Sequence, residues 1–138
     1  MNRKIEFRAW FKEEKKMYGV SEIHFSLEGI KYIVCCDLET YDRPYFYVDL
    51  KDIELIQYTG LKDTNGVKIF EGDIVQINDD WDTYGMNAGE KYEIYFYAGG
   101  FRCKPKYNAK SKGYWLDDGN DVVVLGNIYE NPELLEVA

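Results

Sequence analysis

Several short stretches of the chain alternate between apolar and polar residues with a period of two, which is typical of half-buried β-strands. Residues 5–10 and residues 92–97 show this alternation. Residues 30–38, with the sequence IKYIVCCDL, are almost continuously apolar, which favours a strand in the middle of a sheet. Residues 53–58 and 122–125 are rich in residue types that favour extended structure. These patterns predict a sheet built from many short strands.

Turn-forming residues separate these stretches. Asn65-Gly66 lies between apolar flanks, which is the strongest short-range signal for a β-hairpin, and we predict a type I′ turn with positive φ at both residues. Glu71-Gly72-Asp73 predicts a second turn that leads into an apolar strand, as is common in small barrels of the SH3 type. Residues 58–75 therefore predict a hairpin and not an active site. Residues 41–47, which include a proline, predict a loop.

The end of the chain carries the signals of one short helix. Asn131 can cap it, Pro132 fits its first position, and Glu133 places negative charge in its first turn. The rest of the chain reads as about eight to ten short strands with turns between them. We therefore expect a mainly β chain that forms one compact unit. It would contain a small N-terminal β subdomain over residues 1–58, and an SH3-like β-barrel with the C-terminal helix over residues 59–138.

Composition narrows the class of protein. The chain has 138 residues, of which 46% are hydrophobic and 17% aromatic, so it can bury a core and favours β structure. Its net charge of −8 weighs against non-specific binding to nucleic acid or to an anionic membrane. The first residues lack the apolar region of a signal peptide, and no stretch approaches the roughly 18 apolar residues of a membrane span. We expect a cytoplasmic protein.

Residue types that carry out catalysis are sparse. His24 is the only histidine, so a His-dependent nucleophile or a His-rich metal site has little support, and we interpret it as structural or exposed. Cys35 and Cys36 would point to opposite faces of a strand, and we interpret both as small core residues. The chain has no C-x-x-C pair and no glycine-rich phosphate loop. The sequence thus predicts no catalytic residue, no metal site and no cofactor, and an enzyme has the least support.

Two acidic stretches could in principle hold a cation. Asp80 and Asp82 fit two ligand positions of an EF-hand loop, but Lys91 stands where the loop needs its final glutamate. We interpret residues 78–91 as a solvated acidic loop, with a weak cation site of another kind as the alternative. The carboxylates of residues 117–121 are interpreted as turn residues.

Residues 101–115, with the sequence FRCKPKYNAKSKGYW, combine basic and aromatic residues without an acidic one. Basic side chains neutralise phosphates and aromatic rings stack on bases, so this composition is typical of a surface that binds single-stranded nucleic acid. The alternative, which we favour, is a solvated hairpin whose lysines protect an edge strand. The same patch could also contact an acidic surface of a neighbouring subunit.

Three stretches of the chain resemble one known family. IEFRAW near the start, YTGLKDTNGVKIFEGDIV in the middle and LGNIYENPELLE near the end are similar to the YopX-like family of phage and prophage proteins. The resemblance implies a protein of unknown biochemical function in a bacterial host cell, with no catalytic residues to transfer. It also implies the assembly of several chains.

We therefore expect a phage or prophage accessory protein that works by binding, as a homo-oligomer or on a host or phage protein. The high aromatic content fits this expectation, because Tyr and Trp are enriched in the cores of protein interfaces. One alternative is a nucleic-acid-binding module that uses residues 101–115. Another is an acidic protein that imitates DNA and occupies a host DNA-binding protein. The net negative charge of the chain suggests this alternative.

Overall fold

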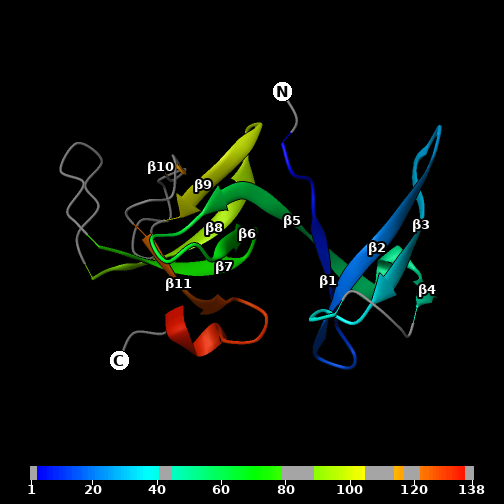
Figure 1. Cartoon of the computed structure of the whole chain (residues 1–138), viewed down its shortest axis with the longest axis horizontal. Helices are drawn as coiled ribbons and strands as arrows, with labels where there is room; N and C mark the ends of the chain where they lie inside the picture. Colours follow the sequence, from blue (N-terminus) through cyan, green and yellow to red (C-terminus); the bar gives the residue numbers. More distant parts are fainter. Residues whose placement is uncertain (1–2, 41–44, 79–88, 105–113, 117–121, 136–138) are drawn as a thin grey trace. The chain divides into compact units, whose positions relative to one another are not determined.

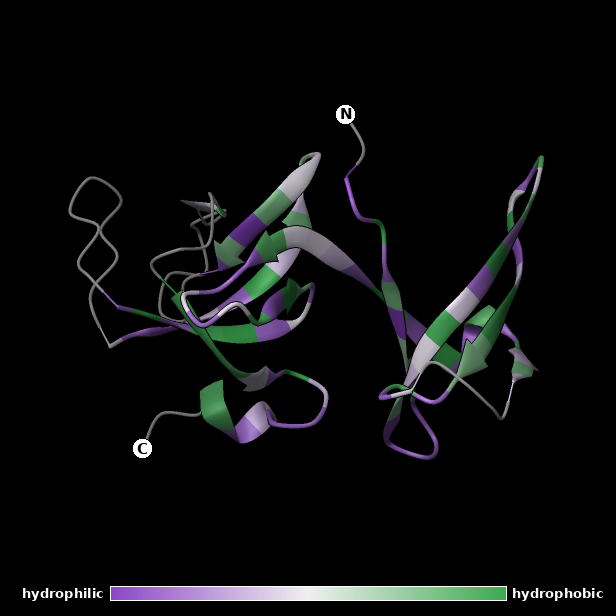
Figure 2. Ribbon diagram, viewed as in Figure 1, coloured by the Kyte–Doolittle hydropathy of each residue, from purple (hydrophilic) through white to green (hydrophobic). Residues whose placement is uncertain are grey.

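The structure, a computed structural model, describes residues 3–40, 45–78, 89–104, 114–116 and 122–135. It confirms the mainly β class, because antiparallel strands dominate and the described helices are single 3-10 turns. The chain divides into two compact units, residues 1–57 and residues 58–138, while the sequence placed the boundary one residue further along. Figure 1 shows the strands of each unit, and Figure 2 shows hydrophobic and hydrophilic residues interspersed along them.

The first unit is an antiparallel sheet in the order β4-β3-β2-β1-β5. Its elements are β1 (Phe7–Phe11), β2 (Lys16–Ser26), β3 (Gly29–Cys36), β4 (Phe46–Val48), the 3-10 turn η1 (Leu50–Asp52) and β5 (Ile53–Lys62). One face of this sheet packs around Ala9, Ile33, Cys35 and Ile53. The strand β5 pairs with β1 through residues 53–57 and continues into the second unit, where it pairs with β6.

Two details of the first unit differ from the sequence prediction. The loop expected over residues 41–47 is partly wrong, because Phe46–Val48 form β4, which pairs with Ile33–Cys35 at the edge of the sheet. Aromatic and β-branched side chains favour this extended edge, whereas the nearby proline suggested a loop. Ile5 precedes β1 and is 63% exposed, so the alternation seen at residues 5–10 begins before the paired strand.

The second unit contains a five-stranded sheet in the order β10-β9-β8-β7-β11. Its elements are β6 (Lys68–Phe70), β7 (Asp73–Ile77), β8 (Lys91–Tyr97), β9 (Gly100–Lys104), β10 (Tyr114–Trp115), β11 (Val122–Asn127) and the 3-10 turn η3 (Pro132–Leu135). Its core is built from Ile69, Val75, Ile77, Tyr92, Ile94, Cys103 and Val122. The SH3-like barrel is not confirmed, because β10 and β11 lie at opposite ends of the sheet and do not pair in the described residues.

The short C-terminal helix is present as the single turn η3. Leu134 N–H donates to the carbonyl oxygen of Asn131 at 3.1 Å, which closes this turn. The side chain of Asn131 has a different partner from the one the sequence predicted, because its Oδ1 accepts from Asn127 N–H at 3.3 Å. Asn131 therefore fastens the turn that follows β11. No helix within the described residues has the length and hydrophobicity that a membrane crossing requires.

The segment 58–75 forms the predicted hairpin, β5–β6, but with a different turn. Gly66 has a φ of 80°, whereas the φ of Asn65 is negative, so the type I′ prediction is wrong. Gly66 N–H donates to the carbonyl oxygen of Asp63 at 3.0 Å, and Asp63 N–H donates to that of Val67 at 2.8 Å. This is the pattern of a type I turn followed by a left-handed glycine in a three-residue loop.

The side chain of Asp63 explains this wider turn. Its carboxylate is buried and accepts hydrogen bonds from Asn65 N–H at 2.8 Å and from Val67 N–H at 2.9 Å. Its second oxygen accepts from Val124 N–H of β11 at 2.9 Å, from a residue 61 positions along the chain. Because a buried carboxylate must have its hydrogen bonds satisfied, a turn that points two N–H groups at it is favoured.

The turn before β7 is closed in the same way. Asp73 is buried, and its carboxylate accepts from Phe70 N–H at 2.7 Å. Gly72 has a φ of 86°, and its N–H donates to the carbonyl oxygen of Ile94 at 2.7 Å. A Cβ at Gly72 would lie 2.7 Å from Cε2 of Tyr129, so both the backbone angle and the space require glycine. These hydrogen bonds and contacts give the segment a role in backbone geometry.

We expect Asp63→Ala to lower the free energy of unfolding by about 3 kcal/mol, because three backbone N–H groups lose a charged acceptor. Urea denaturation followed by circular dichroism measures this loss. Asp49→Ala is the matched control, since its exposed carboxylate accepts one backbone N–H, from Lys51, and should cost less than about 1 kcal/mol. Equal losses for the two variants would contradict the role given to Asp63.

Gly72→Ala should destabilise the protein by about 1 kcal/mol more than Gly66→Ala does. Both glycines have positive φ, so both variants carry backbone strain, but only Gly72 faces a neighbouring side chain within 4 Å of the added methyl group. Thermal unfolding of the two variants separates strain from steric overlap. If the contact with Tyr129 is the cause, Tyr129→Ala will reduce the difference. If the difference between the two glycine variants is unchanged in the Tyr129→Ala protein, the steric explanation is wrong.

Candidate binding surfaces

His24, Cys35 and Cys36, which the sequence analysis interpreted as structural residues, all lie in the first unit. The ring of His24 stacks on Tyr32 with 4.1 Å between ring centroids, and its Nε2 lies 3.8 Å from a carboxylate oxygen of Glu22. Cys35 and Cys36 are both buried, which agrees with their interpretation as core residues. Burial, helped at Cys35 by the neighbouring Cys36, raises the pKa of the Cys35 thiol to about 12. Such a thiol stays protonated and makes a poor nucleophile.

Several sequence candidates lie wholly or partly outside the described residues. The acidic loop is described only at its two ends. The carboxylates at 117–121 and residues 105–113 of the basic segment lie outside the described ranges. Within the described ranges, no group of three or more His, Cys, Asp or Glu side chains is placed to hold a metal ion. The surfaces below are therefore built from described residues alone.

The first candidate surface is the outer part of the β2–β3 hairpin. β1 pairs with β2 only up to Gly19, and β4 pairs with β3 only from Ile33. Residues 24–32, called the ribbon below, therefore have no third strand on either side in the described residues. Figure 1 shows this hairpin extending past β4. A two-stranded ribbon is marginally stable alone in water, so its side chains need further contacts.

The ribbon carries large apolar and aromatic side chains in solvent. Phe25 is 71% exposed, and Leu27 at the tip is fully exposed. On the same hairpin His24 and Tyr32 stack, and Tyr32 contacts the ring of Tyr47 on β4 at 5.3 Å. A groove of about 640 Å³ runs beside the ribbon, lined among others by Ile5, Phe7, Val20, Ile23 and Phe25. Contiguous exposed apolar surface of this kind marks interaction sites.

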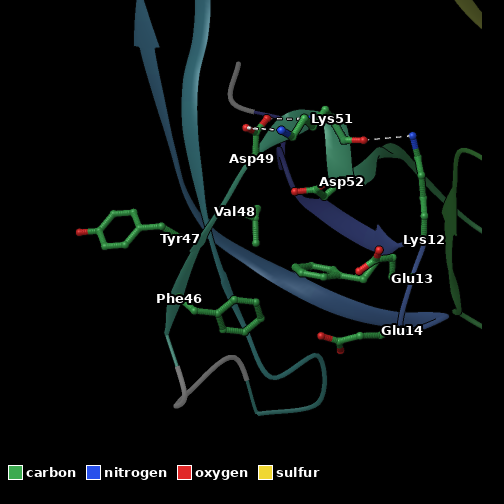
Figure 3. A pocket seen from close by; sticks show the side chains of 10 residues that line it. Lys12, Glu13, Glu14, Phe46, Tyr47, Val48, Asp49, Lys51 and Asp52 are labelled. Atoms are coloured by element: carbon green, nitrogen blue, oxygen red, sulfur yellow. Dashed lines mark hydrogen bonds and ion pairs between the residues drawn. The ribbon is translucent and has the colours of Figure 1, made fainter.

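A second groove, of about 460 Å³, lies between the β1–β2 turn and the segment that joins β4 to β5 (Figure 3). It is lined by the half-buried Phe11, Phe46 and Val48 and by the exposed acids Glu13, Glu14 and Asp52. Tyr18 O–H donates to Glu14 at 2.8 Å, and this hydrogen bond raises the pKa of Tyr18. The carboxylates of Glu13 and Asp52 have no hydrogen bond or ion pair within the described residues. Lys12 and Lys51 also line the groove, but its four carboxylates outnumber these two ammonium groups. The groove therefore offers net negative charge beside apolar surface, which suits a basic side chain.

The third surface is one face of β8, β9 and β10, and it contains the described part of the basic segment. The strand register places Tyr95, Arg102 and Trp115 side by side on this face. The guanidinium carbon of Arg102 lies 4.1 Å from the ring centroid of Trp115 and 5.5 Å from that of Tyr97. The ammonium of Lys104 lies 5.8 Å from the ring centroid of Tyr95. We call these five residues the cation–aromatic face.

Sequence reasoning found only part of this face. It singled out Arg102, Lys104 and Trp115, but it missed Tyr95 and Tyr97, which lie in a neighbouring strand. The signal was available in the alternation of residues 92–97. Because Tyr92 and Ile94 are buried in the core, Tyr95 and Tyr97, which have the opposite parity along the strand, must lie on the other side of the sheet.

Comparison with known proteins gives the family. The family described as YopX protein matches residues 6–136, nearly the whole chain. This chain belongs to the YopX family. The crystal structure of protein EF1440 from Enterococcus faecalis is similar to it, with 29% sequence identity and a TM-score of 0.62 over 98% of this chain and 100% of that chain. No curated protein matches the chain.

The resemblance inferred from three short stretches is thus confirmed for this YopX-family protein, because the family match contains all three apart from Ile5 at the start of the first. EF1440 is similar over its full length, so the likeness extends across both units and not only across the central hairpin. Neither comparison assigns a catalytic, metal-binding or ligand-binding residue.

The buried thiols of this YopX-family protein predict how its stability depends on pH. Burial raises the pKa of Cys35 and of Cys103 to about 12, above the value of about 8.5 in an unfolded chain. Folding therefore favours the protonated thiols, and their contribution is complete below the unfolded pKa and is lost as pH rises toward about 12. The free energy of unfolding should fall by about 1.4 kcal/mol per pH unit for each thiol in this window.

Cys103→Ala removes one of these two thiols, so the free energy of unfolding should fall less steeply with pH in this window, by about 1.4 kcal/mol per pH unit. The variant starts from lower stability at neutral pH, because the substitution leaves a cavity in the core. Urea denaturation at a series of pH values measures both slopes. Tyrosine and lysine titrations are common to the two proteins and cancel in the comparison. Parallel slopes would show that the Cys103 thiol ionises as readily in the folded chain as in the unfolded one.

Proposed function

We propose that this YopX-family protein is a non-catalytic binding module that assembles with copies of itself or docks on another protein. The observation that supports this most directly is the ribbon, in which Phe25 and Leu27 are exposed on the outer part of the β2–β3 hairpin, where no third strand pairs with it in the described residues. Burying apolar side chains of this size stabilises a complex by about 1.5 to 3 kcal/mol each. A folded chain that leaves them in water gains from a partner that covers them.

Two further features of the first unit support a protein partner. The groove beside the ribbon continues its apolar surface through Ile5 and Phe7, so the area available to a partner exceeds the ribbon alone. The second groove, beside the β1–β2 turn, could receive a basic side chain of the partner, because the carboxylates of Glu13 and Asp52 are not paired within the described residues. An apolar centre with charged groups around it is the usual anatomy of a protein interface.

The expected setting is phage or prophage biology in the cytoplasm of a bacterial cell. There the protein would act as an accessory factor on a host or phage protein, or as a homo-oligomer. This setting is an inference from what the YopX family implies. The likeness to EF1440 covers 98% of this chain, so the first unit, which carries the ribbon, lies within the part that the two proteins share.

We expect the double variant Phe25→Ser, Leu27→Ser to weaken self-association at least tenfold, because two exposed apolar side chains leave the ribbon. Sedimentation equilibrium over a wide range of protein concentration measures the change. The matched control is Val67→Ser, Leu125→Ser, which removes two exposed apolar side chains of the second unit. Circular dichroism verifies that both variants remain folded.

The outcomes separate the two forms of the proposal. If the ribbon variant disrupts the oligomer and the control variant leaves it intact, assembly through the ribbon is supported. If the wild-type protein is monomeric, self-assembly is excluded. Docking on another protein then requires a second experiment, in which the wild-type protein captures a host or phage protein from nuclease-treated lysate and the ribbon variant captures none. Equal capture by both proteins would overturn the role of the ribbon. An oligomer unaffected by the ribbon variant would do the same.

A further inference from the structure

The cation–aromatic face of the second unit lies on the side of the sheet that faces away from its core. Along β8 the residues alternate, so that Tyr92 and Ile94 pack into the core while Tyr95 and Tyr97 lie on the other side. Along β9, Cys103 enters the core and Arg102 lies beside Tyr95. An antiparallel sheet can bury one face and leave the other to solvent, and such an open face is a platform for a ligand.

Two of the three rings on this platform are exposed, whereas Tyr95 is half-buried. Trp115 is 53% exposed and Tyr97 is 40% exposed. The indole of Trp115 lies close to the backbone of β9, because a Cβ at Gly100 would collide with its ring. The absence of a side chain at Gly100 therefore allows the indole to lie over the sheet, where one side of the ring can accept a stacking partner.

The side chain of Arg102 is held between aromatic rings and has no hydrogen-bonded partner among the described residues. Its guanidinium lies against Trp115 and Tyr97, and its Nε is buried without a hydrogen bond. The terminal Nη groups have no hydrogen bond within the described residues, so they are the donors that could contact a ligand. A guanidinium that is already ordered by stacking loses little entropy when it binds a phosphate with these two donors.

We propose that the cation–aromatic face binds single-stranded nucleic acid. Three cations lie on this side of the sheet, since the alternation of β8 adds Lys91 to Arg102 and Lys104. Among the described residues, the acid beside them is Glu93, whose pKa is raised because burial outweighs the opposing effect of the nearby Lys104. Cations would contact phosphates, while Trp115 and the tyrosines would stack on bases, which is how single strands are bound without sequence preference.

Single strands fit this face better than duplexes do. Bases must be unpaired to stack on protein rings, and a broad sheet face cannot enter the major groove of a duplex. The net charge of −8 opposes binding over long distances, but at physiological salt charges beyond about 8 Å are screened. The local cations therefore determine attraction at the face. This site lies in the second unit and does not depend on the ribbon, so each proposal can fail without the other.

The test is the anisotropy of a fluorescein-labelled oligothymidine of about 12 nucleotides, titrated with the full-length protein at about 50 mM NaCl. Trp115→Ala should weaken binding between about fivefold and about 100-fold through the lost stacking, and Trp115→Phe should restore much of it. Tyr47→Ala, which removes an aromatic ring that is 74% exposed in the first unit, is the matched control and should bind as wild type does.

Salt dependence tests the contribution of the cations. With three phosphate contacts, the logarithm of affinity should fall with the logarithm of salt concentration with a slope of about −2 between about 50 and about 200 mM. Lys104→Gln should make that slope shallower by about 0.7, whereas Lys51→Gln, an exposed lysine of the first unit, should leave it unchanged.

Four results would overturn the proposal. They are the absence of binding at the lowest salt, a flat salt dependence, equal affinity of Trp115→Ala and wild type, and preference for a duplex of the same length. Loss of binding in Trp115→Ala together with retention in Trp115→Phe and Tyr47→Ala supports it. In that case binding should also persist in the ribbon variant, which separates this site from the proposed protein interface.

Discussion

The buried carboxylate of Asp63 is the constraint on which the second unit depends. It accepts two N–H groups of its own turn and one of β11, so a local hairpin and the last strand of the sheet are joined at one charged group. A carboxylate in the interior is tolerated only when its oxygens are satisfied, so the turn and β11 must form together. The same principle places Asp73 against Phe70 N–H at the start of β7. Val122 of β11 and Val75 of β7 then meet in one core.

The two units leave different surfaces unburied, for different reasons. In the first unit, β1 and β4 are too short to accompany β2 and β3 along their whole length, so the outer hairpin lacks neighbours and exposes apolar side chains. In the second unit, the strands have neighbours, but the described sheet uses one face for its core and leaves the other open. The first surface suits a protein, since burial of apolar area drives association. The second combines charge with stacking, which suits nucleic acid.

Prediction of the candidate sites was limited by what a linear pattern contains. The composition of residues 101–115 pointed to cations and aromatics, yet the rings nearest to Arg102 and Lys104 include Tyr97 and Tyr95, which belong to another strand. Their contact depends on the pairing register of β8 with β9, and alternation within one strand does not contain that register. The ribbon was missed for a similar reason. Whether a hairpin has a third strand depends on the lengths of its neighbours, here β1 and β4.

Local chemistry was enough to predict the mainly β class, the hairpin at residues 58–75 and the short C-terminal turn, because alternation and turn residues act over a few positions. The family could also be read from contiguous motifs. The type of the turn at Asn65-Gly66 was not readable locally. A distant strand supplies the third N–H to Asp63, and satisfying that carboxylate outweighs the preference of Asn-Gly for a type I′ turn. The open sheet and the two candidate surfaces likewise depend on which strands pair and how far, since pairing between distant segments follows from the packing of the whole core.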